Sequence, residues 1–371
     1  MKVLFITNIP SPYNVDYLNE LGKLCEVTAV FERRTSKGRD KSWGDYKATH
    51  FKCIVLNGLK YKNDMSISVS VVRYIKAFRD DRIIIANPAS PTGIISIVYC
   101  KLNRIPFILQ SEGGFAGNSN GIKEKIKKRL MSGAVMYLSG MKSDKEYFLS
   151  YGGTRDTIVN YPFTSYYDKD IRKSSPSIEE KRNAADELGL LGDFRVLYVG
   201  SINYNKGVDI LLQAFSGFED NIHLYLVGGK ITSELQNIIE EMHLSNFHFV
   251  EFANKEIVQK YYLGSDIFVL PTRGDTWGLV INEAMSFGLP VITTKSCVAG
   301  YELIEDYENG FLIDSEDIED LHKKIEFLIE NRNIVNRMGD NNIRKIQPYN
   351  LENMAFVIYS ALRGNNDGKN L

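Results

Sequence analysis

Short, mostly apolar segments alternate with helical patterns along the first half of this 371-residue chain. The apolar segments span residues 2–7, 25–31, 53–56, 82–86 and 106–110. Helical patterns at 66–79 and 92–102 lie between them. Strands that are covered on both faces of a parallel sheet are short and apolar in this way. The alternation therefore predicts a doubly wound α/β domain.

A second series of the same kind fills the other half of the chain. Its apolar segments span residues 195–199, 223–227, 247–250, 267–270 and 290–293. Residues 208–215 have the apolar spacing of one buried helical face. Residues 161–177 contain prolines, serines and charges without periodicity, which is typical of a linker. We therefore expect one domain at 1–165, a second at 178–349, and a last helix at 351–362.

The composition excludes several classes of protein. The net charge is −1, whereas proteins that bind nucleic acid usually carry an excess of positive charge. We therefore expect no nucleic-acid partner. The four cysteines are scattered without metal-ligand spacing, which indicates reduced thiols and a cytoplasmic location. No apolar run approaches the ~20 residues of a membrane-spanning helix. These observations leave peripheral attachment to a membrane open.

The strongest functional signal lies at residues 266–292, where a buried strand, a polar loop and a helix follow one another. The helix is predicted to begin near Trp277 or Gly278, and the N–H groups of a helix start bind phosphate. Asp275 lies in the loop and Glu283 eight positions later on the helix. Carboxylates there suit a sugar hydroxyl and a ribose diol. Each acid alone is more often structural, Asp275 as a helix cap and Glu283 as a solvated residue, but the combination favours a nucleotide-sugar site.

This segment resembles the acid-x7-acid region of the retaining glycosyltransferases of family 4, including its tail from Glu283-Ala-Met to Gly-Leu-Pro-Val-Ile. The resemblance implies that Asp275 contacts the donor sugar and that Glu283 holds the ribose. It implies that main-chain amides at Trp277, Gly278 and Leu279 bind the phosphates. The family usually has Glu where this chain has Asp275, and the shorter side chain bears on the identity of the sugar.

The resemblance also implies the fold and the reaction. The fold is α/β of the GT-B type, two doubly wound Rossmann-like domains facing across a cleft, with a helix at 350–363 that crosses back to the first domain. The reaction is transfer of a sugar with retention of configuration, without a metal or other cofactor and without an enzymatic nucleophile. UDP-hexose is the expected donor, ahead of GDP-mannose. A glycan or lipid-linked saccharide is the expected acceptor, in surface polysaccharide biosynthesis.

A second signal follows the first strand of the second domain. Gly200 and Ser201 form a turn, and Lys206 lies before the next helix, where its charge can offset a leaving diphosphate. In the resembled family a Lys-Gly pair at this place contacts the donor pyrophosphate. An arginine often occupies the position of Ser201, so Lys206 is expected to carry more of the charge, assisted by Arg273 or the helix start. A lysine in a loop is otherwise an ordinary solvated residue.

The third region is the glycine-rich segment 105–117 in the first domain, which follows a strand and lacks the Gly-Lys-Ser/Thr of a Walker A loop. It resembles the family's loop that meets donor sugar and acceptor. Glu112 then orients the sugar or the acceptor hydroxyl, with Gly113 and Gly114 beside it. Tyr13, in a Pro-Tyr segment similar to one in this branch, is expected on the acceptor side. A plain surface loop is the alternative.

A basic helix is predicted at 122–130, with apolar residues at every fourth position. Its cations are Lys123, Lys125, Lys127, Lys128 and Arg129. A solvated helix packed on its sheet explains this pattern. The alternative is contact with anionic lipid, where each basic residue contributes ~1 kcal/mol.

Other functions are weighed against this one. A metal-dependent transferase needs an Asp-x-Asp pair after a strand, whereas residues 168–170 lie in the expected linker and are interpreted as surface charge. A Rossmann dehydrogenase is disfavoured because no G-x-G-x-x-G motif follows any expected strand of this chain. A nucleotide-sugar epimerase of the same fold, or a catalytically silent nucleotide-sugar-binding partner of another transferase, are the remaining alternatives.

Overall fold

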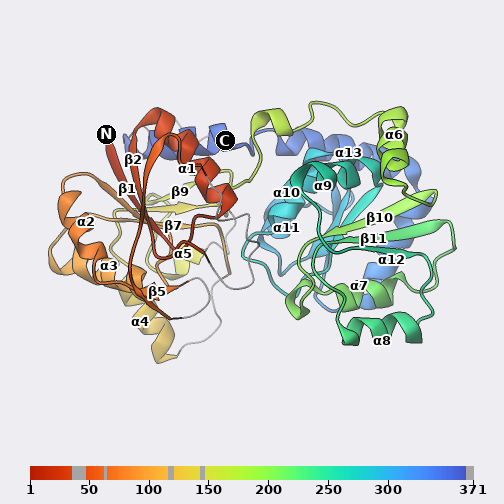
Figure 1. Cartoon of the computed structure of the whole chain (residues 1–371), viewed down its shortest axis with the longest axis horizontal. Coiled ribbons are helices and arrows are strands. Elements are labelled where there is room, and N and C mark those ends of the chain that lie inside the picture. The colour runs from red at the N-terminus through yellow and green to blue at the C-terminus, as the bar shows by residue number, and fades with distance from the viewer. Residues whose placement is uncertain (36–46, 62–64, 116–120, 143–146, 365–371) are drawn as a thin grey trace. The chain divides into compact units, whose positions relative to one another are not determined.

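The computed structural model describes residues 1–35, 47–61, 65–115, 121–142 and 147–364 (Figure 1). The chain forms two compact units. The first comprises Met1–Tyr167 together with the C-terminal segment from Tyr349, and the second is Asp168–Pro348. The division therefore falls within the segment that was expected to be a linker.

The first unit is built on a parallel sheet with the strand order β3-β2-β1-β6-β7-β8-β9 in its described part. These strands are β1 (Lys2–Thr7), β2 (Glu26–Phe31), β3 (Phe51–Val55), β6 (Arg82–Ile85), β7 (Ile108–Ser111), β8 (Met136–Ser139) and β9 (Ile158–Asn160). In the register of the centre, Val3 lies opposite Val27 on one side and Arg82 on the other. A small antiparallel pair, β4 (Leu59–Lys60) and β5 (Ser66–Ile67), lies outside this sheet.

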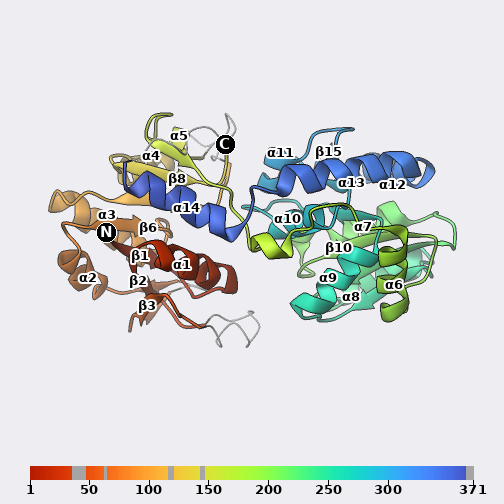
Figure 2. The ribbon, with the colours of Figure 1, turned by 90° about the horizontal axis from the view of Figure 1, so that it is seen from above.

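Helices cover both faces of this sheet. They are α1 (Pro12–Leu24), α2 (Val71–Ala77), α3 (Pro91–Leu102), α4 (Ile122–Met131), α5 (Tyr147–Ser150) and α14 (Leu351–Leu362). Helix α14, the last of the chain, lies beside α1 (Figure 2). Tyr17 of α1 packs edge-on against Phe5 of β1. Because side chains alternate along a strand, Leu4 and Ile6 face the opposite side.

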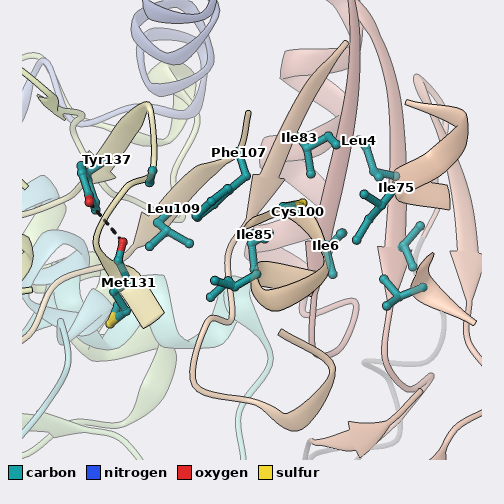
Figure 3. Close-up of a cluster of buried hydrophobic side chains, with 14 of the residues drawn as sticks. Leu4, Ile6, Ile75, Ile83, Ile85, Cys100, Phe107, Leu109, Met131 and Tyr137 are labelled. Carbon is teal, nitrogen blue, oxygen red and sulfur yellow. Dashed lines mark hydrogen bonds between the residues drawn. The ribbon is translucent and has the colours of Figure 1, made fainter. Parts of the chain in front are cut away.

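Leu4 and Ile6 belong to the core that joins the sheet to α2, α3 and α4 (Figure 3). Ile83 and Ile85 of β6 and Leu109 of β7 extend it across the neighbouring strands, and all are at most 1% exposed. Burying an aliphatic side chain of this size contributes about 1.5–3 kcal/mol. Apolar burial therefore fixes which face each helix covers.

The second unit contains a parallel sheet with the order β12-β11-β10-β13-β14-β15. Its strands are β10 (Phe194–Val199), β11 (Ile222–Val227), β12 (Phe247–Val250), β13 (Ile267–Leu270), β14 (Val291–Thr294) and β15 (Gly310–Ile313). Its helices are α6 (Ile178–Leu188), α7 (Val208–Phe215), α8 (Ser233–Glu241), α9 (Lys255–Gly264), α10 (Leu279–Ser286), α11 (Val298–Leu303), α12 (Ile318–Glu330) and α13 (Arg332–Ile346). The two parallel-sheet units give the chain the α/β GT-B fold, as its structural neighbours below also indicate.

Two expectations from the sequence are wrong. The helix expected at 66–79 begins only at Val71, because Ser66 is drawn into β5, where its N–H donates to the Glu32 carboxylate at 2.9 Å. The linker was expected to start too early, because Tyr161 and Phe163 are buried in the first unit. Strands β4, β5, β8, β9 and β15 were not predicted from the sequence.

Candidate functional site

The strand order of the second unit defines where a ligand is expected. From β10 the chain runs outward through β11 and β12, then returns to place β13 on the other side of β10. Ligands of open parallel sheets bind at the carboxyl ends of the strands at such a switch point. The loop after β10 carries Lys206, and the loop after β13 carries Asp275.

Lys206 and Asp275 are in direct contact. The Nζ atom of Lys206 donates to the Oδ2 atom of Asp275, and the two side chains are 22% and 17% exposed. The same Oδ2 atom lies 3.6 Å from the position that a Cβ on Gly278 would occupy. A cation, a carboxylate and the start of α10 therefore converge at the switch point.

Helix α10 begins with a left-handed residue. Gly278 is its N-cap with φ 103°, and a Cβ there would lie 2.7 Å from the Cys297 sulfur, so the position requires glycine. The first N–H groups of a helix have no intrahelical acceptor, so this end suits an anion. The Trp277 side chain is buried, with its indole N–H on the Asn282 Oδ1 atom at 2.8 Å. At the start of α10, Trp277 can therefore contact a ligand only through its main chain.

Glu283 lies one turn after Leu279 on α10, on the same side of the helix. Its Oε2 atom accepts a hydrogen bond from the Tyr262 hydroxyl at 3.1 Å. Tyr262 belongs to α9 and is fully buried. The tyrosine therefore fixes the direction of the Glu283 carboxylate. This partner was not predictable from local patterns because it lies 21 positions away.

Glycines bring the loops after β10 and β11 together. The N–H of Gly200 donates to Val227 O at 2.9 Å, and Ser201 Oγ accepts from Asn203 Nδ2 at 2.9 Å. A Cβ on Gly228 would lie 2.5 Å from Gly200 O. The Gly-Gly pair directly after β11 was overlooked in the sequence, although glycines just after a strand are a sign of close backbone approach.

Arg273 lies beside this site but is held by carboxylates. Its guanidinium donates to both carboxylate oxygens of Asp209, at 2.9 and 2.7 Å, and its Nε donates to Glu316 Oε1 at 2.8 Å. The side chain is 14% exposed. Arg273 therefore lies in ion pairs with Asp209 and Glu316, partners that the sequence did not indicate.

In the first unit the structure joins two residues that the sequence placed on the acceptor side. The Tyr13 hydroxyl donates to Glu112 Oε1 at 2.9 Å, and the Tyr13 ring packs edge-on against Phe163. Glu112 follows β7, and the next two residues, Gly113 and Gly114, have φ of 157° and 140°. The glycine-rich loop continues into residues 116 and 117, which lie outside the described residues.

Helix α4 differs from the expected packing. Ile122 and Ile126 would face the sheet in the first of the two interpretations above, but they are 78% and 55% exposed, while Met131 is buried. Lys127 lies over the rings of Tyr147 and Tyr151. Burial lowers the pKa of Lys127. The helix therefore presents isoleucines to solvent, and one of its five cations is committed to the protein.

Metal ligation and membrane spanning can be assessed for the described residues. Among them, no group of three or more His, Cys, Asp or Glu side chains is arranged to hold a metal ion. Asp168 and Asp170 pair instead with Lys173 and Lys255, each at 2.7 Å. In this described part, no helix combines the length and apolarity needed to cross a lipid bilayer.

Comparison with known proteins addresses the second unit most directly. Residues 180–345 match the family model of the glycosyl transferases group 1. This matched segment is thus similar to the group 1 glycosyltransferases. It contains Lys206, Asp275, Gly278 and Glu283.

Curated relatives of the chain include an uncharacterized glycosyltransferase of Haemophilus influenzae, 30% identical over 45% of this chain and 48% of the relative. The capsular polysaccharide biosynthesis glycosyltransferase CapM of Staphylococcus aureus is 29% identical over 43% of each chain. The chain thus spans about half the length of the curated relatives it matches.

A solved structure extends the likeness to both units. Anabaena HepE in complex with UDP is similar with a TM-score of 0.79 and 17% identity, over 98% of this chain and all of that one. At this identity the likeness shows the fold, which is GT-B for the whole described chain.

Proposed function

We propose that the chain is a retaining glycosyltransferase that moves a sugar from a nucleotide-sugar donor to a saccharide or lipid-linked acceptor. The observation that carries this proposal is the convergence of Lys206, Asp275 and the start of α10 at the switch point of the second sheet, within the segment that matches the group 1 model. The relatives reported above are named as glycosyltransferases, which supports transfer over epimerisation.

The donor diphosphate binds at the start of α10, with Lys206 beside it. When the sugar–phosphate bond breaks, the sugar gains positive charge and the leaving phosphate gains negative charge. Lys206 and the amides near Gly278 and Leu279 stabilise that negative charge, and fixed charges act strongly where water is excluded. No metal ion is needed for this role in the proposal, because the lysine and the helix start supply the positive potential.

The two carboxylates bind the ends of the donor. Asp275 accepts hydrogen bonds from hydroxyls of the sugar, and Glu283, held by Tyr262, accepts them from the ribose. In family 4 the acceptor attacks on the face that the phosphate leaves, and the phosphate helps remove the acceptor proton. We therefore assign no protein nucleophile.

UDP-hexose is the proposed donor. HepE, whose fold this chain shares, has been solved with UDP, with UDP and glucose, and with UDP-glucose, which supports a uridine diphosphate sugar here. The capsule role in the name of the Staphylococcus aureus relative supports a surface polysaccharide as the acceptor. Glu112, bonded to Tyr13, is the proposed acceptor-side acid in the first unit.

We further propose that α4 contacts anionic lipid at the cytoplasmic face of a membrane. Ile122 and Ile126 are exposed on this helix, which suits insertion into a membrane interface. Lys123, Lys125 and Lys128 are exposed beside them, whereas Lys127 lies against tyrosine rings.

Sedimentation with phosphatidylserine vesicles tests this contact between α4 and lipid. Replacing Lys123, Lys125 and Lys128 by glutamine abolishes sedimentation, and the same change at Lys230, Lys260 and Lys323 in the other unit preserves it. Wild-type protein that stays in the supernatant contradicts the proposal.

A nucleotide-sugar panel tests the main proposal. A donor at 100 times its dissociation constant raises the free energy of unfolding by ~2.7 kcal/mol, which thermal unfolding detects. The stabilising donor is then incubated with water or saccharides, and the products are separated. Release of the nucleotide with sugar transfer or slow hydrolysis supports the proposal. A rearranged sugar nucleotide identifies an epimerase, and tight binding without turnover identifies a silent binding protein.

A further inference from the structure

The guanidinium of Arg273 connects three segments of the second unit. It forms the two-point ion pair with Asp209 at the start of α7 and a bond to Glu316 just before α12. It also lies 3.9 Å from the centre of the Tyr204 ring and donates to Tyr204 O at 2.6 Å. A planar guanidinium can make all of these contacts at once because its donors point in fixed directions.

The backbone strengthens the same connection. Asn205 O accepts hydrogen bonds from the Arg273 N–H and from the Thr272 hydroxyl, both at 2.7 Å. A Cβ on Gly207 would lie 2.1 Å from Pro271 O, so the two loops are in contact there as well. Lys206 lies between Asn205 and Gly207, which means that both of its neighbours are fixed to the loop that carries Asp275.

The charge balance argues against a direct role for Arg273 at a phosphate. Two carboxylates surround its one positive charge, so the cluster has no net positive charge to offer. Burial of Asp209 opposes its ionisation, but the hydrogen bonds and charge of Arg273 outweigh this and lower the pKa of Asp209. The hydrogen bonds from Arg273 to Asp209 also raise the pKa of the arginine. The ion pair is therefore intact over the physiological pH range.

We propose that Arg273 and Asp209 form a positioning clamp that holds Lys206 at the distance from Asp275 and α10 that diphosphate departure requires. The proposal rests on the proposed function, because it assigns the clamp a purpose at the same site. Arg273 acts through Lys206 and does not itself touch the donor. A lysine at 273 keeps the charge but cannot make the two-point contact, and Asp209→Asn weakens the same contact from the other side.

A double-mutant cycle on turnover of the donor tests this role. Arg273→Lys lowers kcat about 10-fold or more while the donor KM changes little, because a catalytic group misplaced by about 1 Å can lower the rate ~100-fold. In a Lys206→Ala background the same change has almost no further effect, since residues that act together are not additive. Asp209→Asn gives the same pattern. The clamp is overturned if the fold-changes in kcat of Arg273→Lys and Lys206→Ala simply multiply in the double variant.

Arg332→Lys is the matched control. Arg332 stacks on Phe194 and donates to Asp193 O in the same unit, and its replacement leaves kcat unchanged. Hydrogen–deuterium exchange gives a second readout that does not depend on activity. In Arg273→Lys the loops 201–207 and 271–276 exchange faster while the rest of the unit is unchanged. Unaltered exchange in both loops overturns the clamp, whereas a wild-type chain without any turnover overturns only the proposed function.

Discussion

Lys206 Nζ contacts Asp275 Oδ2 across the switch point of the second sheet, although the two residues are 69 positions apart in the chain. Each side chain is mostly buried and satisfies the charge of the other. A donor that brings a diphosphate to Lys206 and hydroxyls to Asp275 replaces this contact with two new ones. The pair therefore holds both groups together at the carboxyl ends of β10 and β13.

Replacing Lys206 by alanine removes the cation beside the diphosphate. We expect kcat to fall by ~100-fold or more, as for other groups that stabilise charge in a transition state. Steady-state kinetics with the stabilising donor measures this. Lys260→Ala is the control, because Lys260 pairs with Glu187 on the surface at 2.6 Å. A Lys206→Ala enzyme within a few-fold of wild type removes Lys206 from the reaction.

Replacing Glu283 by glutamine weakens the proposed contact to the ribose. A hydrogen bond to a charged group contributes about 1.5–3 kcal/mol, so UDP affinity falls about 10-fold or more. Tyr262→Phe, which only releases the carboxylate, has a smaller effect. Titration calorimetry with UDP and with its 2′,3′-dideoxy analogue gives the comparison. Equal losses for both nucleotides place Glu283 away from the ribose.

Alanine at position 278 is expected to destabilise the second unit. The left-handed backbone and the nearby Cys297 sulfur together cost about 1–3 kcal/mol in the free energy of unfolding. Gly274→Ala is the control for stability, since a Cβ there meets no atom within 4 Å. Urea unfolding of the two variants measures the difference. Equal stabilities contradict the assignment of strain to Gly278.

Glu32 makes the stability of the first unit depend on pH. Burial raises its pKa from 4.5 to about 6, so the folded state holds the proton more tightly than the unfolded chain does. The stability from this group is present below pH 4.5 and is lost as the pH rises through 6. Relative to Glu32→Gln, wild type should lose about 2 kcal/mol over this range. Urea unfolding at several pH values tests this, and a constant difference contradicts it.

Metal removal tests the proposed source of positive charge. If Lys206 and the start of α10 suffice for diphosphate departure, EDTA leaves turnover within about twofold of that in magnesium. Turnover that requires an added divalent cation contradicts this part of the proposal. Dialysis against EDTA before the assay removes metal carried through purification.

Local patterns in the sequence were sufficient to predict most strands of the two sheets. The expected strands differ from β1, β2, β3, β6 and β7 and from β10 to β14 by no more than two residues at either end. Helices α7 and α14 have the expected bounds, 208–215 and 351–362. These elements were predictable because apolar spacing and turn residues are local properties. Asp275 and Glu283 stood out for the same reason.

Long-range partners were not predictable from one sequence. Ser66 joins β5 because Glu32, 34 positions earlier, accepts its N–H. Arg273 was expected at a phosphate, and its ion pairs with Asp209 and Glu316 were not predicted. The sequence around Arg273 is the same whether the arginine pairs with carboxylates or contacts a phosphate. Only the packing of α7 and α12 against the loop after β13 distinguishes them.

A crystal structure of the chain soaked with UDP tests the central claim most directly. We expect the diphosphate at the start of α10, with Lys206 Nζ and the amide of Leu279 within about 3.2 Å of its oxygens. We also expect the ribose hydroxyls on Glu283 and an opened Lys206–Asp275 contact. UDP bound elsewhere in the chain, with that contact intact, would contradict the proposed function.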